Sequence, residues 1–297
     1  NIDEFQNHLS MLQKNYQLIS LEDASNLSYG GISFHKKNLG ILITFDDGLA
    51  DHYTAAKILS ELNISAIFFI PTCILEEKLP ANPTIIHYTI AIFGIEKFLK
   101  EFREILVNNK LDKKLFDVQY SKDKDNVLDI ISKIKSTFKY KLGYHNSRKI
   151  LLGIYKNLFS SEYKNMLSTI HLTESQIREM LEMGHYVGTH TYSHISVAAT
   201  ELNSDDFIKE IISPKNYLEQ KFNTKVNSFS YPFGGKNDCL SSSDLIKKTS
   251  EYNLAFTVEE ILNTKNTSPY QLGRYQINSS DTSFKLNSII QNISKKN

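Results

Sequence analysis

The feature that most constrains the fold of this chain is a set of short apolar runs, each of which ends abruptly in polar residues. The run at residues 39–45 leads directly into Asp46 and Asp47. A continuous apolar run of this kind is typical of a strand buried in a parallel sheet, whose C-terminal end opens into a loop. A helix is predicted at residues 54–62 and a second buried strand at residues 65–70. Strand, helix and strand in this order predict a βαβ unit.

The same alternation continues in the second half of the chain. Thr173 and Gln176 form a capping box that begins a helix, Gly184 ends that helix, and a strand at residues 185–188 stops just before His190. The other predicted elements are a helix at 2–12, a strand at 17–20, a helix at 205–222, a strand at 226–231, a helix at 242–251, a strand at 254–258, and a strand and a helix within 275–293. A length of 297 residues allows one barrel or two ordinary domains. The repeated alternation favours one α/β barrel.

Residues 79–165 depart from this alternation. They contain Lys-rich amphipathic helices and no convincing strand, as at residues 127–138, where apolar residues recur at helical spacing. We therefore expect a helical insertion at about 79–165 within a single catalytic domain that spans residues 1–297.

Composition narrows the classes of partner. The chain has 34 Lys and Arg against 33 Asp and Glu, so neither nucleic acid nor another polyanion is expected as its main partner. Cys73 and Cys239 are too few for a disulfide framework and are interpreted as core thiols. No apolar run reaches the length of about 18 residues that a membrane span requires, and this segment does not open with a signal peptide. The bacterial cytoplasm and the cell envelope both remain open as locations, and the oligomeric state is not predicted.

Two histidines and two aspartates form a candidate metal site. His190 and His194 are four positions apart, so in a helical turn both imidazoles would point the same way. A carboxylate from another strand would complete a three-ligand site with room for water, a set that suits zinc or a similar divalent ion. Adjacent carboxylates at a strand end point to opposite sides, so one of Asp46 and Asp47 can bind the metal while the other accepts a proton. The spacing does not choose between them, and each motif alone is more typical of a solvated helix face or of a plain turn or helix cap.

Three polar motifs each follow the end of a predicted strand: residues 44–48 (Thr-Phe-Asp-Asp-Gly), 190–194 (His-Thr-Tyr-Ser-His) and 231–234 (Tyr-Pro-Phe-Gly). Together they resemble the first three motifs of the polysaccharide deacetylases, carbohydrate esterase family 4. The resemblance covers about residues 1–293 without the insertion. It implies a distorted (β/α)7-type barrel, with Asp46 as the general base and Asp47, His190 and His194 as the metal ligands.

The third motif also has an implied role. By the resemblance, the backbone N–H of Phe233 stabilises the oxyanion, and Pro232, which has no N–H, stiffens the loop. Without the family, the same four residues would be interpreted as an aromatic turn.

The chain departs from the commonest family pattern at two places. Phe229 and Ser230 stand where many members have an Arg, and Leu272-Gly273-Arg274 stands where many have a Leu-x-His motif that supplies the general acid. Arg274 resembles the variant of biofilm- and surface-polysaccharide deacetylases and is expected to pair with Asp46, although it could instead cap a strand end.

The same variant begins with a Tyr-His strand that is absent here, although residues 2–5 and 18–21 resemble the segments that follow it. We therefore expect that an N-terminal strand and the general-acid His lie upstream of Asn1. His87 could fold over the mouth of the barrel from the insertion, or could be an ordinary surface residue. The remaining histidines are assigned no chemistry: His8, His35, His52, His145, His171 and His185.

The resulting hypothesis is a metal-dependent hydrolase, with Zn²⁺ as the expected ion. Its substrate would be an N-acetylated amino sugar in a bacterial surface polysaccharide, a lipopolysaccharide or a lipid-linked precursor. One alternative is a deformylase or deacetylase of another acylamino sugar. A second is a catalytically silent glycan-binding module that has kept the barrel.

Overall fold

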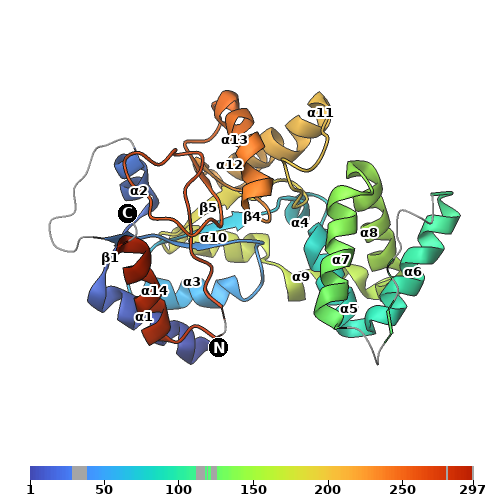
Figure 1. Cartoon of the computed structure of the whole chain (residues 1–297), viewed down its shortest axis with the longest axis horizontal. Coiled ribbons are helices and arrows are strands. Elements are labelled where there is room, and N and C mark those ends of the chain that lie inside the picture. The colour runs from blue at the N-terminus through green and yellow to red at the C-terminus, as the bar shows by residue number, and fades with distance from the viewer. Residues whose placement is uncertain (29–38, 112–117, 119, 122–125, 279, 296–297) are drawn as a thin grey trace.

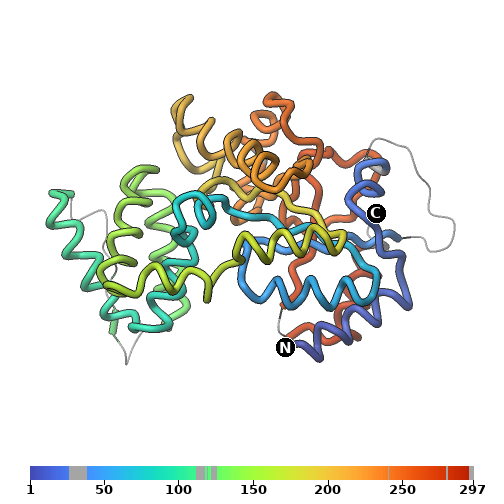
Figure 2. Tube along the Cα trace, turned by 180° about the vertical axis from the view of Figure 1, so that it is seen from behind, coloured from blue at the N-terminus to red at the C-terminus, as the bar shows by residue number. Residues whose placement is uncertain are grey.

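The computed structural model has two parts, an α/β half-barrel and a layer of helices beside it (Figure 1). The structure describes residues 1–28, 39–111, 118, 120–121, 126–278 and 280–295. The helical layer lies at one end of the long axis in both views (Figures 1 and 2). No helix in these ranges is long and apolar enough to cross a membrane.

The centre of the half-barrel is a parallel five-stranded sheet with the order β3-β4-β5-β6-β7. A separate parallel pair, β1 and β2, lies next to it in the chain. The strands are β1 (Gln17–Leu18), β2 (Gly40–Ile41), β3 (Ile43–Phe45), β4 (Ala66–Ile70), β5 (Tyr186–Thr189), β6 (Ser228–Ser230) and β7 (Leu254–Phe256). The curled, all-parallel arrangement with helices around it confirms the predicted distorted (β/α)7-type barrel.

The apolar run at residues 39–45 differs from its prediction as one buried strand. It divides at Leu42 into β2 and β3, which belong to different sheets. All three residues of β3 are only partly buried, whereas all five residues of β4 are buried. The reason is position in the sheet, since β3 is an edge strand and β4 has a neighbour on both sides.

Helices cover both faces of the sheet (Figure 1). They are α3 (His52–Glu61), α10 (Glu174–Glu182), α12 (Ser213–Phe222) and α13 (Lys236–Thr249), with α2 (Leu21–Ser28), α4 (Cys73–Glu76) and α9 (Leu167–Ile170) as shorter pieces. The capping box that begins α10 is present, because Thr173 and Gln176 bond reciprocally to each other's backbone N–H. Cys73 and Cys239 are buried free thiols, as expected.

The helix predicted at residues 205–222 is interrupted. It consists of α11 (Ser204–Phe207), a π-helical segment η3 (Ile208–Ile212) and α12. Pro214 in the first turn of α12 has no N–H to donate to an earlier turn, and one extra residue is accommodated just before it.

The strand predicted near residue 275 does not form among the described residues. The chain instead makes a single parallel bridge between Leu272 and Phe256, and helix α14 (Ser283–Lys295) follows. Helix α14 packs against α1 (Ile2–Asn15), so that the first and last helices lie side by side (Figures 1 and 2).

The described part of residues 79–165 is helical and has its own core. Its helices are α5 (Asn82–Phe93), α6 (Ile95–Asn108), α7 (Val127–Tyr140), α8 (Tyr144–Phe159) and the 3₁₀ turn η2 (Ser160–Lys164). Phe98, Phe102, Ile134, Leu151 and Tyr155 are fully or almost fully buried in one cluster between these helices. That this segment is an insertion into one catalytic domain stays a prediction.

Candidate active site

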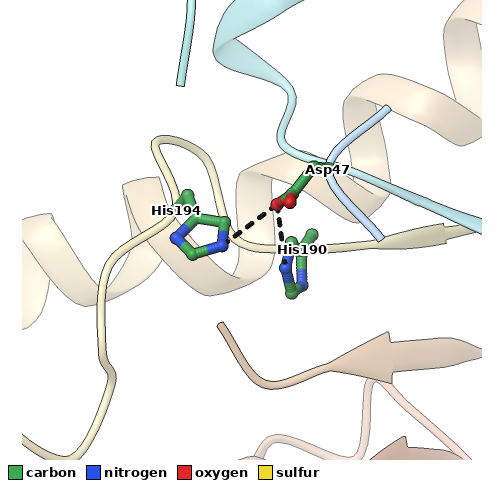
Figure 3. Close-up of side chains that lie close together, drawn as sticks. All are labelled: Asp47, His190 and His194. Carbon is green, nitrogen blue, oxygen red and sulfur yellow. Dashed lines mark ion pairs between the residues drawn. The ribbon is translucent and has the colours of Figure 1, made fainter. Parts of the chain in front are cut away.

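Asp47, His190 and His194 converge at the C-terminal edge of the sheet (Figure 3). Asp47 follows β3 and His190 follows β5 directly, and a ligand atom from each of the three residues lies within 4.8 Å of the other two. Asp47 Oδ1 is 3.1 Å from His194 Nε2 and 3.5 Å from His190 Nε2. The parallel register of the sheet causes this meeting, because the strand ends lie along one edge.

The histidine pair does not lie in a helical turn, which corrects the geometry expected from their spacing. Residues 191–193 form a turn, with φ of 57° at Thr191 and 63° at His194. The Thr191 hydroxyl stabilises this turn by accepting from the His194 N–H at 3.0 Å and the Ile195 N–H at 3.2 Å. The two imidazoles are nearly perpendicular, with ring centroids 4.7 Å apart.

Hydrogen bonds orient the first histidine toward the carboxylate. His190 Nδ1 lies 2.8 Å from the carbonyl oxygen of Ser230, and donation of its proton there leaves Nε2 as the lone-pair nitrogen facing Asp47. A ligating His in proteins usually has such a partner on its second nitrogen. The Nδ1 of His194 is buried and has no hydrogen-bond partner among the described residues.

The charges of these three groups are mutually dependent. Burial alone would raise the pKa of Asp47, but the neighbouring His194 and His190 outweigh it and hold that pKa well below its usual range. Burial alone would lower the pKa of His190, but Asp46 and Asp47 outweigh it and raise that pKa. The three residues form a donor set of two imidazole nitrogens and one carboxylate oxygen, which converge on one point. Such a set fits a tetrahedral divalent cation with one position left for water.

Asp46 has a different environment from Asp47, because it forms an ion pair with Arg274. Arg274 Nη1 and Nη2 donate to Asp46 Oδ1 and Oδ2, both at 2.8 Å, and the Ser230 hydroxyl donates to Oδ2 at 3.1 Å. The guanidinium is itself held by the Thr257 carbonyl at 2.8 Å and the Thr44 hydroxyl at 3.1 Å. This is the bidentate geometry in which Arg recognises a carboxylate. The expected contact between Arg274 and Asp46 is therefore present.

The same contact determines the charge of Asp46. Burial would raise the pKa of this carboxyl, but the Arg274 guanidinium and the nearby His190 outweigh it and lower that pKa. Asp46 is thus ionised and lies next to the three candidate ligands. The ion pairs with the two imidazoles are made by Asp47.

Phe233 occupies a strained backbone position beside His194. Its φ is 65°, and its ring packs edge-on against the His194 ring with centroids 4.9 Å apart. A positive φ is uncommon for a bulky residue and marks a constrained turn. The Phe233 N–H donates no hydrogen bond within the described part of the chain, so it is available to a ligand.

A cavity of about 380 Å³ adjoins this site. On one side it is lined by His194 and Phe233, and on the other by residues of α5, α7 and α8, among them Lys135 and Lys139. The sequence reasoning missed these lysines, because a Lys-rich amphipathic helix is usually a solvated face.

Glu210 is a second group that the sequence reasoning missed. Its fully buried carboxylate accepts from the backbone N–H groups of Tyr192 and Ser193, both at 3.0 Å, and from the Ser193 hydroxyl at 2.7 Å. It also accepts from the Tyr144 hydroxyl of α8 at 2.8 Å. Glu210 thus joins the histidine turn to the helical layer. No local pattern indicated this, because its partners lie far away in the sequence.

The other histidines have structural partners or lie apart from the site. His87 lies on α5 with an exposed side chain, and partial loss of hydration, followed by the nearby Lys135, lowers its pKa. His145 pairs with Asp206 at 3.2 Å. Three more bond to backbone groups: His8, His171 and His185. His52 accepts from the Leu49 N–H, and burial lowers its pKa to about 4. His35 lies outside the described residues.

In a comparison with protein families, residues 114–250 match the family described as polysaccharide deacetylase. The matched region contains the second and third motifs, His190 to His194 and Tyr231 to Gly234, and lies C-terminal to Asp46 and Asp47. The comparison with curated proteins found no match.

Solved structures of the same fold include three deacetylases. The Streptococcus pyogenes deacetylase PplD is 16% identical with a TM-score of 0.58, and the match covers 97% of this chain and 85% of that one. IcaB from Ammonifex degensii is 17% identical with a TM-score of 0.53, covering 97% and 88%. A de-N-acetylase from Aggregatibacter actinomycetemcomitans is 14% identical with a TM-score of 0.51, covering 95% and 87%. At these identities the likeness establishes the fold.

Proposed function

The family match confirms the resemblance to the polysaccharide deacetylases, and from this premise we propose that the protein is a metal-dependent hydrolase that removes N-acetyl groups from amino sugars of a bacterial glycan. The observation that carries the proposal is the pairing of two sites: a donor set from Asp47, His190 and His194, and, beside it, a carboxylate that Arg274 holds ionised. The first suits a divalent ion and the second suits a general base.

In this proposal Asp46 accepts the proton of the attacking water. A general base must be ionised at working pH and fixed in direction, and the bidentate contact with Arg274 supports both requirements. The hydroxyl of Ser230 adds a third restraint on the same carboxylate.

Asp47, His190 and His194 would hold the metal, and Zn²⁺ is the ion that this donor set suits best. The chemistry supplied by a bound divalent cation is polarisation of the amide carbonyl and acidification of water. The Phe233 N–H, which has no partner in the described part of the chain, would donate to the developing oxyanion. No described residue is assigned the role of general acid.

We further propose that the natural substrate is a glycan of the bacterial surface or one of its lipid-linked precursors. Two structural neighbours, PplD and the enzyme from Aggregatibacter actinomycetemcomitans, are a deacetylase and a de-N-acetylase, which supports amide hydrolysis of an acetylated sugar. A formyl or another small acyl group would undergo the same amide hydrolysis. A silent glycan-binding module is disfavoured, because sugar binding alone does not require an ionised carboxylate clamped beside a donor set.

The test measures metal content and turnover together. We expect one divalent ion per chain by elemental analysis, and acetate release from N-acetylglucosamine oligomers that stops on chelation and returns on addition of Zn²⁺. His190→Ala and His194→Ala should lose the ion, because each removes one of three ligands. His145→Ala is the matched control, since His145 is 75% exposed and pairs with Asp206 away from the donor set.

Stoichiometric metal in both ligand variants would show that the site has been placed wrongly. Stoichiometric metal in the wild type without release of any acyl group from acetylated or formylated sugars would instead favour the binding module.

A further inference from the structure

The wall of the cavity that faces His194 carries two lysines of α7, and their environments differ. Lys139 is neutralised, because its ammonium forms an ion pair with Asp238. It also lies over the Phe233 ring, 4.3 Å from the centroid, and over the Tyr140 ring at 4.9 Å. Its side chain is only 11% exposed. The contacts of Lys139 therefore indicate a structural role, in which this side chain holds α7 against the turn that carries Phe233.

Lys135 lies one helical turn earlier, lines the same cavity, and has no such explanation. It is partly buried, and within the part of the chain that the structure describes it forms no ion pair and no hydrogen bond. Burial lowers its pKa, while the Asp47 carboxylate raises it. Its ammonium is therefore partly removed from water and close enough to the candidate metal site to interact with Asp47.

Asp47 does not serve as the partner of Lys135, because its oxygen already faces both imidazoles. Glu201 also lines the cavity but is exposed, as is Lys141. A partly buried ammonium that no carboxylate contacts directly is unfavourable, since it has lost some hydration and has gained no hydrogen-bond partner. An anion that enters the cavity would supply that partner.

We propose that Lys135 binds an anionic group, a carboxylate or a phosphate, carried by the glycan close to its N-acyl group. The inference rests on the proposed function, and it makes the substrate an acidic glycan rather than a neutral one. A Lys ammonium suits either anion, because it acts as a point charge with three donors and does not impose the planar geometry of an Arg. The helical layer would then determine specificity, while the half-barrel carries the chemistry.

The experiment compares the binding of three probes by calorimetry at fixed ionic strength to the metal-loaded full chain. The probes are a neutral N-acetylglucosamine oligomer, a disaccharide of glucuronic acid and N-acetylglucosamine, and N-acetylglucosamine 6-phosphate. The proteins are the wild type, Lys135→Met, and the matched control Lys133→Met, which removes the same charge from an exposed position on the same helix.

We expect the wild type to bind at least one anionic probe about tenfold more tightly than the neutral oligomer, the magnitude typical of a hydrogen bond to a charged group. Lys135→Met should abolish this preference and Lys133→Met should keep it. Preference for the disaccharide indicates a carboxylate, and preference for the phosphosugar indicates a phosphate. Thermal unfolding of both variants checks that the helical layer stays folded.

Equal affinities of the wild type for all three probes would overturn the inference, and so would an anionic preference that survives in Lys135→Met. Because affinity is measured by calorimetry and turnover by the release of acetate, failure of the proposed function is seen separately from failure of this inference. A Lys135-dependent preference in a protein that releases no acyl group would retain the anion site and reject the deacetylase.

Discussion

Two adjacent aspartates have acquired different surroundings, and at the scale of single residues this is the basis of the proposed chemistry. Asp47 faces two imidazoles, and Asp46 faces a guanidinium. Both carboxylates are ionised, and Asp47 points an oxygen at the histidine nitrogens (Figure 3).

The two residues should therefore respond differently to mutation. We expect Asp46→Asn to keep the metal and to lower kcat by about 100- to 10 000-fold, the range typical of a lost general base. Asp47→Ala should lose both metal and turnover, because a ligand is removed. Elemental analysis beside steady-state kinetics measures both effects. Equal loss of metal in the two variants would contradict the division of roles.

Removal of Arg274 tests whether the clamp orients and charges Asp46. With Arg274 present, the pKa of Asp46 is lowered, so the base stays ionised to lower pH. In Arg274→Ala that pKa rises, so the acidic limb of the kcat/KM profile should move to higher pH, with metal content unchanged. Arg274→Lys should restore the charge without the two-pronged geometry and recover little activity. Full activity of Arg274→Lys would exclude orientation of Asp46 as the role of Arg274. An unchanged kcat/KM profile in Arg274→Ala would exclude both the orienting and the charge effect.

At the scale of elements, the histidine turn depends on η3. The turn contains positive φ values at both Thr191 and His194. The carboxylate of Glu210 in η3 accepts hydrogen bonds from the two backbone N–H groups between them. π-Helical segments in proteins are often found at functional sites. Here the segment carries the buried carboxylate that accepts four hydrogen bonds from side chains and backbone of other elements.

Replacement of this carboxylate should weaken metal binding from outside the ligand set. Glu210→Gln puts an amide NH₂ where donors already point, so at least one buried donor loses its acceptor, at a cost of about 1–3 kcal/mol. We expect a lower unfolding temperature and a weaker metal affinity by competition with a chelator. Glu182→Gln, at an exposed position on α10, is the control for the same chemical change. Unchanged metal affinity in Glu210→Gln would show that the turn is stable without this carboxylate.

At the scale of the whole molecule, α1 and α14 are joined by contacts of Asp281, which lies just before α14, and of Asn287 within α14. His8 Nε2 lies 2.6 Å from the Asp281 carbonyl oxygen, and the Tyr16 hydroxyl donates to Asn287 at 2.7 Å. The Asp281 carboxylate accepts from the Tyr275 hydroxyl at 2.9 Å and from the Asn278 N–H at 2.8 Å, and pairs with Lys285. These contacts hold α14 against α1.

Asp281 should make this packing sensitive to acid. Lys285, then the Asn278 N–H, lower the pKa of this carboxyl to about 2 in the folded state. Because the folded pKa lies below the unfolded one, its stabilisation is present in full above about pH 4 and is lost as the pH falls toward 2. We expect Asp281→Asn to unfold at a lower temperature than the wild type at pH 7, and the difference to narrow between pH 5 and 2. A difference that does not change with pH would show that the charge is not what stabilises the turn.

The class of the fold and the residue types of the site could be predicted from the amino-acid sequence. The apolar strands, the capping box before α10 and the three motifs depend on neighbours within a few positions, so local patterns contain the information. The same reasoning failed where an interaction was not local. The run at residues 39–45 divides because β2 pairs with β1 whereas β3 pairs with β4. Near residue 275 the described residues make a single bridge, from Leu272 to Phe256, in place of the predicted strand.

The way in which the site is assembled became visible in the three-dimensional structure. This structure replaced the expected helical turn with a left-handed turn at His190 to His194, supplied Glu210 to hold that turn, and brought Lys135 of α7 to the same cavity as His194. These groups come from segments separated by tens of residues, and their contacts depend on the register of a parallel sheet and on the packing of a separate helical layer. The spacing of residues along the chain predicts neither the register nor this packing, because the positions of side chains across a fold depend on where whole elements pack.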